Sequence, residues 1–350
     1  MKILGIETSC DETGAAIVED GRKILSNIVA SSREIHDKTG GVIPEVAARE
    51  QIKCILPVIN QSLQNADCKL QNLDAIAVTV GPGLIGSLLV GVETAKTLSY
   101  IYKKPLIPVN HIFAHIYANF LDSEQEIKFP AIVLVVSGGH TELFYMKDEK
   151  TIKWLGGTLD DASGEAFDKT ARLLGLGYPG GPAIATAADK LRTKNYALIT
   201  KLPRPMINSD DLNFSFSGLK TAVLREVNKL SNLVTRLPAR QVEELAYEIQ
   251  EAITDVLVKK TLDAVNKYKV KTVLLGGGVA ANKRLTEKFK LKINPPAGGL
   301  KTEISLYVPP AKLCTDNGAV IASYAYFHPP AGGSKPWKDV DARPDLEVEV

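Results

Sequence analysis

Three short apolar runs separated by polar turns open the chain. The runs cover 2–7, 15–18 and 23–29, and Glu19-Asp20-Gly21-Arg22 lies between the last two. Short apolar runs joined through an Asp-Gly turn are typical of antiparallel strands connected by hairpins. The pattern therefore predicts a meander of three strands at the start of the chain.

The same order of elements begins again near the middle of the chain. Strands are predicted over 129–136, 141–146 and 151–155, and each of the turns between them is polar. Each three-strand unit is followed by segments with helical or strand-like apolar spacing. These are predicted helices at 44–63, 87–102 and 319–327, one long helix or a helix pair at 238–268, and predicted strands at 74–80 and 272–275.

A three-strand unit that occurs twice, each time followed by helices, indicates a duplicated α/β fold. We predict the actin-like, sugar-kinase and heat-shock ATPase (RNase H-like) architecture, with two domains around a cleft. The expected domains are 1–112 and 113–314. The helix at 315–327 is expected to pack back on the first domain, as in that superfamily. The segment 293–302 is predicted to be a loop, and 328–350 an irregular tail.

Composition and charge narrow the classes of protein. The 350 residues are 45% hydrophobic and 23% charged, which is typical of globular chains. The net charge of only +2 disfavours a dedicated nucleic-acid coat, so any RNA contact must use a local patch or a partner. Four scattered cysteines and no long apolar run favour a soluble cytoplasmic protein without a membrane segment.

Two histidines stand four residues apart in the sequence NHIFAHI. On a helix, His111 and His115 share one face and can bind one ion, and Asn110 can cap that helix. The alternative is a pair of packed or surface histidines. Asp316 is the candidate third ligand, although it could instead cap the last helix. Ile112 follows His111, so the glutamate of the HExxH protease motif is absent.

Two glycine-containing turns follow predicted buried strands. Val135 and Val136 lead into Ser137-Gly138-Gly139, where a phosphate or carboxylate can approach backbone N–H groups. Gly276-Gly277-Gly278 precedes Asn282 in a strand-to-helix turn, a pattern typical of nucleotide sites. Ordinary hairpins and turns remain the alternative reading at both places.

Carboxylates supply the remaining candidates. Asp11 and Glu12, in the first polar turn, could position a proton acceptor or a metal-bound water, or could form a solvated turn. Asp168 is predicted near a helix start, where capping is the alternative to ligand binding.

Ten motifs in one order resemble a single family, TsaD, also called Gcp or YgjD. The resemblance covers about 1–327. The motifs are ETSCDETGAAIV, GGVIPEVAARE, VGPGLIGSLLVG, VNHIFAHI, LVVSGGHTEL, DDASGEAFDK, GYPGGPAIA, FSFSGLKTAV, LGGGVAANKRL and KLCTDNGAVIA.

The resemblance implies transfer of a threonylcarbamoyl group from threonylcarbamoyl-adenylate to N6 of adenosine 37 in tRNAs that read ANN codons, with release of AMP. It implies one divalent metal on His111, His115 and Asp316, given for the family as Fe²⁺, with Zn²⁺ or Mg²⁺ as alternatives. It also implies a TsaB-like paralogue and a TsaE-like ATPase as partners, and a TsaC or Sua-type synthase as the source of the donor. The adenylate residues implied by the resemblance are Val135, Val136, Ser137, Gly138, Gly139, Asp168, Gly181 and Asn282.

Other functions are weighed against the transferase. A metallopeptidase fits the paired histidines but not the residue after His111. A non-catalytic nucleotide-binding partner of the same fold could lose its metal ligands, whereas this chain keeps all three candidates. A sugar kinase would not need two histidines on one helix.

Overall fold

Two compact units make up the computed structural model. The structure describes residues 1–192, 200–231, 237–294, 303–329 and 337–348. Unit 1 comprises Met1–Ile127 and Pro309–Val350, and unit 2 comprises Lys128–Val308. The first boundary lies beyond the expected residue 112, because the turns of α4 (His111–Ala114) and η2 (His115–Phe120) pack on α11 (Gly318–Phe327) of unit 1.

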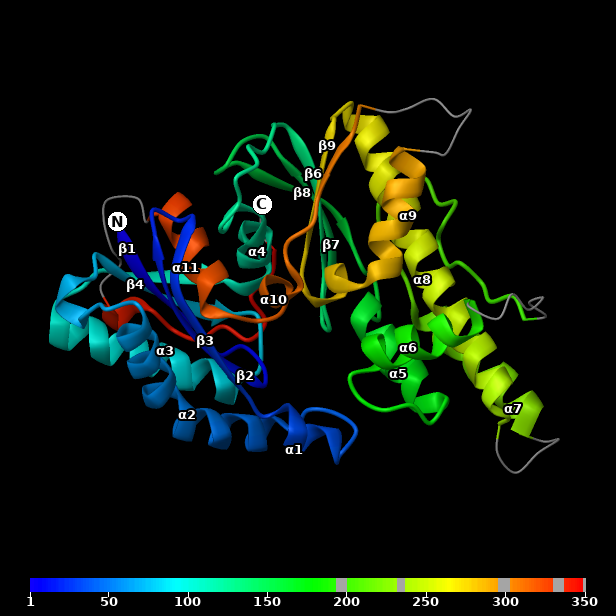
Figure 1. Cartoon of the computed structure of the whole chain (residues 1–350), viewed down its shortest axis with the longest axis horizontal. Helices are drawn as coiled ribbons and strands as arrows, with labels where there is room; N and C mark the ends of the chain where they lie inside the picture. The colour runs from blue at the N-terminus through cyan, green and yellow to red at the C-terminus, as the bar shows by residue number, and fades with distance from the viewer. Residues whose placement is uncertain (193–199, 232–236, 295–302, 330–336, 349–350) are drawn as a thin grey trace. The chain divides into compact units, whose positions relative to one another are not determined.

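Unit 1 is built on a five-stranded mixed sheet (Figure 1). Its strand order is β3 (Lys23–Ser31), β2 (Glu12–Glu19), β1 (Lys2–Glu7), β4 (Ala75–Gly81) and β5 (Leu106–Asn110). The first three strands are antiparallel neighbours, while β1, β4 and β5 run parallel. Asp20 and Gly21 both have positive φ in the β2–β3 turn, as the Asp-Gly hairpin prediction requires.

Unit 2 repeats this topology. Its strand order is β8 (Ile152–Gly157), β7 (Thr141–Met146), β6 (Ala131–Val136), β9 (Thr272–Gly276) and β10 (Ser305–Tyr307). Again the first three strands pair antiparallel and the last three parallel. The predicted duplication is therefore confirmed strand by strand.

Helices cover both faces of the first sheet because its buried strands are apolar on both sides. In unit 1 these are α1 (Arg33–Asp37), α2 (Pro44–Asn65), η1 (Leu70–Asn72), α3 (Ile85–Tyr102), α4 (His111–Ala114), η2, α10 (Ala311–Cys314), α11 (Gly318–Phe327) and η4 (Trp337–Asp339). Leu4, Ile6 and their neighbours face α2 and α3, whereas Ile3 and its neighbours face α11. Figure 1 shows α2 and α3 on one side of the sheet and α11 on the other.

Helix α11 lies unusually close to the sheet because glycines meet there. A Cβ at Gly5 would lie 2.1 Å from the carbonyl oxygen of Gly318, and a Cβ at Gly318 would lie 2.5 Å from the oxygen of Gly5. Only residues without a side chain permit this approach. It fixes the start of α11, and with it the segment just before the helix.

In unit 2, helix α8 (Ala239–Tyr268) is the longest and packs against β6 and four other helices. The remaining helices are α5 (Ser163–Leu173), α6 (Gly180–Arg192), α7 (Ser217–Ser231), η3 (Gly278–Ala281) and α9 (Lys283–Ile293). No helix in the described part of the chain is both long and apolar enough to cross a membrane.

The described part of the C-terminal tail packs on unit 1. Val340 is buried in the core beside α2 and α3, and the backbone N–H of Arg343 donates to the carbonyl of Val80 at 2.6 Å. The tail lacks strands and α-helices over 337–348, in line with the predicted irregularity. Of the predicted loop 293–302, residues 295–302 lie outside the described residues, and Ile293 ends α9.

Candidate functional site

The paired histidines lie at the start of two short helical turns in unit 1. Asn110 ends β5 and caps α4, because its side-chain oxygen accepts hydrogen bonds from the N–H groups of Ile112 and Phe113. His111 opens α4 and His115 opens η2, so the two imidazoles lie on one side of the helical turn. Their Nε2 atoms are 3.2 Å apart, and both side chains are buried.

Asp316 completes a cluster of three donor atoms. Its Oδ1 lies 3.7 Å from Nε2 of His111 and 3.4 Å from Nε2 of His115. Asp316 does not cap α11, because Asn317 accepts the hydrogen bonds of the first helical N–H groups. Ligands bound at about 2.1 Å lie about 3.0–3.4 Å apart around one ion in octahedral or tetrahedral geometry. The cluster therefore fits a metal ion.

Glu7 is a fully buried carboxylate beside this cluster. Its Oε2 lies 3.2 Å from Nδ1 of His111. Burial raises the pKa of Glu7, but the charge and hydrogen bond of His111 outweigh burial and leave this pKa below its ordinary value. For His111 burial lowers the pKa, and Glu7 and Asp316 together raise it to about 9. The sequence did not predict Glu7 as a site residue. Its position as the only carboxylate of the first predicted strand, directly after an apolar run, could have indicated it.

Asp11 and Glu12 occupy the turn between β1 and β2. Asp11 is 8% exposed and lines a cavity of about 190 Å³ with Gln51, Cys54 and others. Glu12 begins β2, and its Oε1 accepts a 3.4 Å hydrogen bond from the hydroxyl of Ser31. Burial, followed by the charges of Asp316 and Asp11, raises the pKa of Glu12 to about 9.

The glycine turn predicted at 137–139 connects β6 and β7 in unit 2. Ser137 N–H already donates to the carbonyl of His140 at 2.9 Å, so it is not a free donor. Gly138 and Gly139 are exposed, and a Cβ at either would meet nothing within 4 Å. Within the described structure, neither glycine N–H has a hydrogen-bond partner. Of the three backbone N–H groups in Ser137-Gly138-Gly139, those of the two glycines are therefore available for an anion.

Val135 and Val136 are fully buried in β6. Their side chains belong to the core, so any contact with a ligand must use backbone atoms.

Asp168 lies inside α5 rather than near its start. Its Oδ1 accepts a 2.6 Å hydrogen bond from the N–H of Gly180, the first residue of α6. Burial raises the pKa of Asp168. Beside it, a Cβ at Gly181 would meet nothing within 4 Å. The carboxylate therefore joins two helices at a place where Gly181 leaves open space.

Asn282 is the N-cap of α9. Its Oδ1 accepts from the N–H groups of Arg284 and Leu285, and its Nδ2 donates to Gln250 at 3.3 Å. Both polar atoms of the side chain are thus used within the chain. The resemblance implies Asn282 as an adenylate residue, and in the structure its side chain caps the start of α9.

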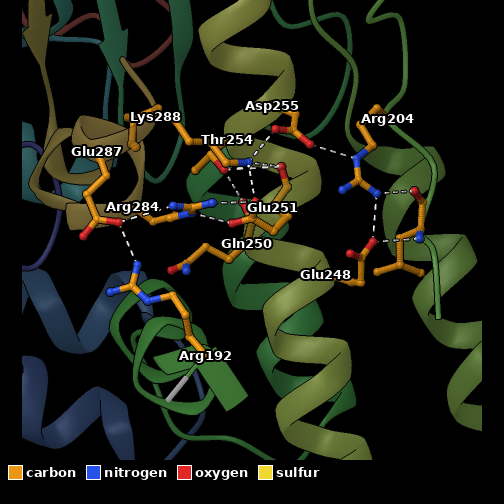
Figure 2. A network of polar contacts seen from close by, with 12 residues as sticks. Arg192, Arg204, Glu248, Gln250, Glu251, Thr254, Asp255, Arg284, Glu287 and Lys288 are labelled. Carbon is orange, nitrogen blue, oxygen red and sulfur yellow. Dashed lines mark hydrogen bonds and ion pairs between the residues drawn. The ribbon is translucent and has the colours of Figure 1, made fainter. Parts of the chain in front are cut away.

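Ion pairs hold the start of α9 on α8 (Figure 2). Arg284 donates from two nitrogens to the carboxylate of Glu251, at 2.6 and 3.0 Å, and Lys288 reaches Glu251 and Asp255. These bidentate, half-buried contacts are stronger than surface pairs. They fix the turn that contains Gly277 and Gly278.

Comparisons with known proteins show which family this chain resembles. Residues 23–323 match the family described as "TsaD: tRNA N6-adenosine threonylcarbamoyltransferase". A protein named tRNA N6-adenosine threonylcarbamoyltransferase from Persephonella marina is 51% identical over 329 residues, covering 93% of this chain and 90% of the relative. One of the same name from Bacillus subtilis is 50% identical over 323 residues, covering 92% and 89%.

Among solved structures, the chain resembles component A of the (R)-2-hydroxyglutaryl-CoA dehydratase of Acidaminococcus fermentans. The TM-score is 0.53 at 14% identity, over 93% of this chain and 98% of that one. At this identity the likeness concerns the fold alone. Together with the two duplicated sheets, it confirms the predicted fold class.

Proposed function

The chain belongs to the TsaD family of tRNA N6-adenosine threonylcarbamoyltransferases, and we propose that it forms threonylcarbamoyladenosine at position 37 of tRNAs that read ANN codons. The donor is threonylcarbamoyl-adenylate, and AMP is released. Within the site, the observation that carries this proposal is the convergence of His111, His115 and Asp316 on one point. A non-catalytic relative of the same fold has no need of such a cluster.

We assign the metal site to these three residues and the metal to iron. Two imidazoles and one carboxylate are the donor set of many non-haem Fe²⁺ sites, and they leave coordination positions open. When bound, the ion would supply Lewis-acid stabilisation of an oxygen of the donor. Both histidines are buried, and their packing keeps the two imidazoles in place.

The reaction needs little covalent chemistry from the protein. The bond between the carbamoyl carbon and the phosphate oxygen breaks, and a bond from that carbon to N6 forms. The adenosine amine loses one proton, which needs an acceptor. The carboxylate of Glu12 already accepts a hydrogen bond from the Ser31 hydroxyl at the start of β2. We therefore assign the acceptor role to Asp11, which also lines a cavity.

We assign the nucleotide part of the donor to unit 2. The free N–H groups of Gly138 and Gly139 suit a phosphate, and their Cβ positions are open. Asp168, beside Gly181, suits the hydroxyls of a ribose. Val135, Val136 and Ser137 shape this turn, and Asn282 supports the pocket by holding the start of α9.

We further propose that tRNA is modified with the help of protein partners, a TsaB-like paralogue and a TsaE-like ATPase, with the donor made by a TsaC or Sua-type synthase. The surface of the neighbouring helices α2 and α3 supports the proposal of a protein partner. They expose Ile52, Leu56, Ile85 and Leu89, each between 44% and 65% accessible. Exposed apolar side chains on two helices that pack together favour a protein interface.

The direct test is a transfer assay. Purified protein is incubated with threonylcarbamoyl-adenylate, tRNA and the partner proteins, and the digested nucleosides are analysed. Threonylcarbamoyladenosine should appear with the wild type and not with His111→Ala. The same preparation, loaded with metal, should not cleave peptides. Peptide cleavage without nucleoside modification would favour the metallopeptidase instead.

A further inference from the structure

Glu7 is buried more deeply than its charge would favour. It ends β1 at 0% exposure, where an unpaired carboxylate would be strongly destabilising. Three donors compensate for the burial. Oε1 accepts from the N–H of Ser9 at 2.5 Å, and Oε2 accepts from the hydroxyl of Thr79 at 2.6 Å. The third contact is the imidazole of His111, at 3.2 Å from the same Oε2.

The two ring nitrogens of His111 face different groups. Nδ1 faces the Glu7 carboxylate, with the hydroxyl of Ser9 at 3.3 Å, while Nε2 faces His115 and Asp316. A carboxylate accepts hydrogen bonds and cannot donate one when ionised. The proton of a neutral His111 ring therefore belongs on Nδ1, and the lone pair on Nε2 points at the ion position.

We propose that Glu7 is a positioning residue of the metal centre, which fixes the ring orientation and the Nδ1–H form of His111 so that Nε2 binds the ion. Carboxylates that accept from the second nitrogen of a histidine ligand act in this way in other metal sites. The inference rests on the metal site of the proposed function and adds a residue to it.

His115 makes the role of Glu7 more specific. Within the described structure, its buried Nδ1 has no hydrogen-bond partner. Of the two histidine ligands, only His111 has a carboxylate against its second nitrogen, so the Glu7 contact fixes the protonation form of one ring alone. Loss of Glu7 leaves neither ring with a carboxylate against its Nδ1.

The first test reads the ring nitrogens directly. The full chain is labelled with ¹³C,¹⁵N-histidine and loaded with Zn²⁺, a diamagnetic probe, and its five histidines are observed by NMR. The His111 ring signals are assigned by ¹³C,¹⁵N correlation to the backbone of the same residue, because His111→Gln would also disturb the His115 signals. We expect a protonated Nδ1 and a zinc-bound Nε2. Zinc bound through Nδ1 would overturn the proposal, independently of the metal affinities of any variant.

The second test measures metal affinity in two variants, by competition with a chelator for Co²⁺. Glu7→Gln should weaken Co²⁺ binding about 10–100-fold and change the visible absorption of the bound Co²⁺. Thr79→Val is the matched control, because it removes another contact of the same Oε2 but leaves the acceptor of His111. Its affinity should stay within about threefold of the wild type.

A structural role of Glu7 alone predicts a different result. Glu7→Gln would then lower the melting temperature of the metal-free protein and leave the Co²⁺ affinity and spectrum of the folded fraction unchanged. That outcome overturns the proposal, as does an equal loss of affinity in Thr79→Val. Absence of Co²⁺ binding by the wild type would instead count against the metal site itself.

Discussion

The Nε2 atoms of His111 and His115 lie 3.2 Å apart in the buried interior of unit 1. Two nitrogens at this separation need a shared proton or cation between them, because their lone pairs otherwise repel. Asp316 adds a negative charge to the same point. Binding of a cation at this point should therefore depend on both histidines.

Replacing either histidine of the pair with alanine should remove the bound metal and reduce transfer at least about 100-fold, since a Lewis acid contributes several kcal/mol to such a reaction. Elemental analysis of the purified variants measures the metal, and circular dichroism checks the fold. His36→Ala is a control, because His36 is buried in unit 1 outside the cluster. It should keep the metal. Full occupancy in the double variant His111→Ala/His115→Ala would contradict the assignment.

The spacing of apolar residues predicted the strands that pair with strands close to them in the sequence. The strands β1 and β7 coincide with their predicted ranges, because short apolar runs between turns define them. The edge strands β5 and β10 were missed. Pro108 interrupts the first, and the second is only three residues long and half-exposed, so both depend on parallel pairing with distant strands.

The same limit applies to the site. The spacing of His111 and His115 is local, and so it could be read from the chain. Glu7 meets His111 across more than a hundred residues, and Asp168 meets Gly180 only because α5 packs on α6. Such contacts arise from tertiary packing and leave no periodic pattern in the sequence.

Asn282→Ala should lower the stability of the protein by about 1 kcal/mol, because the variant loses the cap of α9. The lost cap consists of the hydrogen bonds that the Asn282 side-chain oxygen accepts from the N–H groups of Arg284 and Leu285. Asn282→Ser restores a capping oxygen and should recover most of the loss. Urea unfolding of the three proteins measures the difference, and equal stability of the alanine variant and the wild type would contradict it.

Deprotonation of Glu142 should lower the free energy of unfolding as the pH rises from about 4.5 to about 7. Burial raises its pKa to about 7, against the usual 4.5, and Trp154 donates a 2.7 Å hydrogen bond to it. Because the folded state holds this proton more tightly, the contribution is complete below pH 4.5 and is lost as the pH rises to 7.

Relative to Glu142→Gln, the wild type should therefore lose about 2 kcal/mol across this window, allowing for partial access of solvent. Urea unfolding at several pH values measures this difference. The fluorescence of Trp154 should titrate near pH 7 in the wild type only. A stability difference that does not change with pH would show that folding does not raise the pKa of Glu142.

The isolated chain should bind tRNA weakly. Its net charge of +2 allows few phosphates to be neutralised, so we expect a Kd in the micromolar range or weaker at about 0.15 M salt. Fluorescence anisotropy with labelled tRNA measures this, and addition of the partner proteins should tighten binding. Nanomolar affinity of the chain alone would show that a local patch outweighs the overall charge.

Gly138→Val should abolish most of the affinity for adenylate ligands and leave the fold intact. The glycine does not have a positive φ, and its Cβ position is open, so neither backbone strain nor a clash opposes the larger side chain. The added methyl groups would instead fill the space beside the free N–H groups of Gly138 and Gly139, where we place the phosphate. We expect at least a tenfold loss in affinity for AMP by calorimetry, which corresponds to about 1.4 kcal/mol.

Gly164→Ala is the matched control for this turn. A Cβ there would lie 2.4 Å from the carbonyl oxygen of Ser137 and 2.8 Å from Cα of Gly138, so even one methyl group must displace backbone. This variant should lose thermal stability as well as affinity, whereas Gly138→Val should lose affinity alone. If Gly138→Val bound AMP like the wild type, the phosphate would not lie at this turn. If both variants lost stability equally, the open space beside Gly138 would be needed for folding rather than for a ligand.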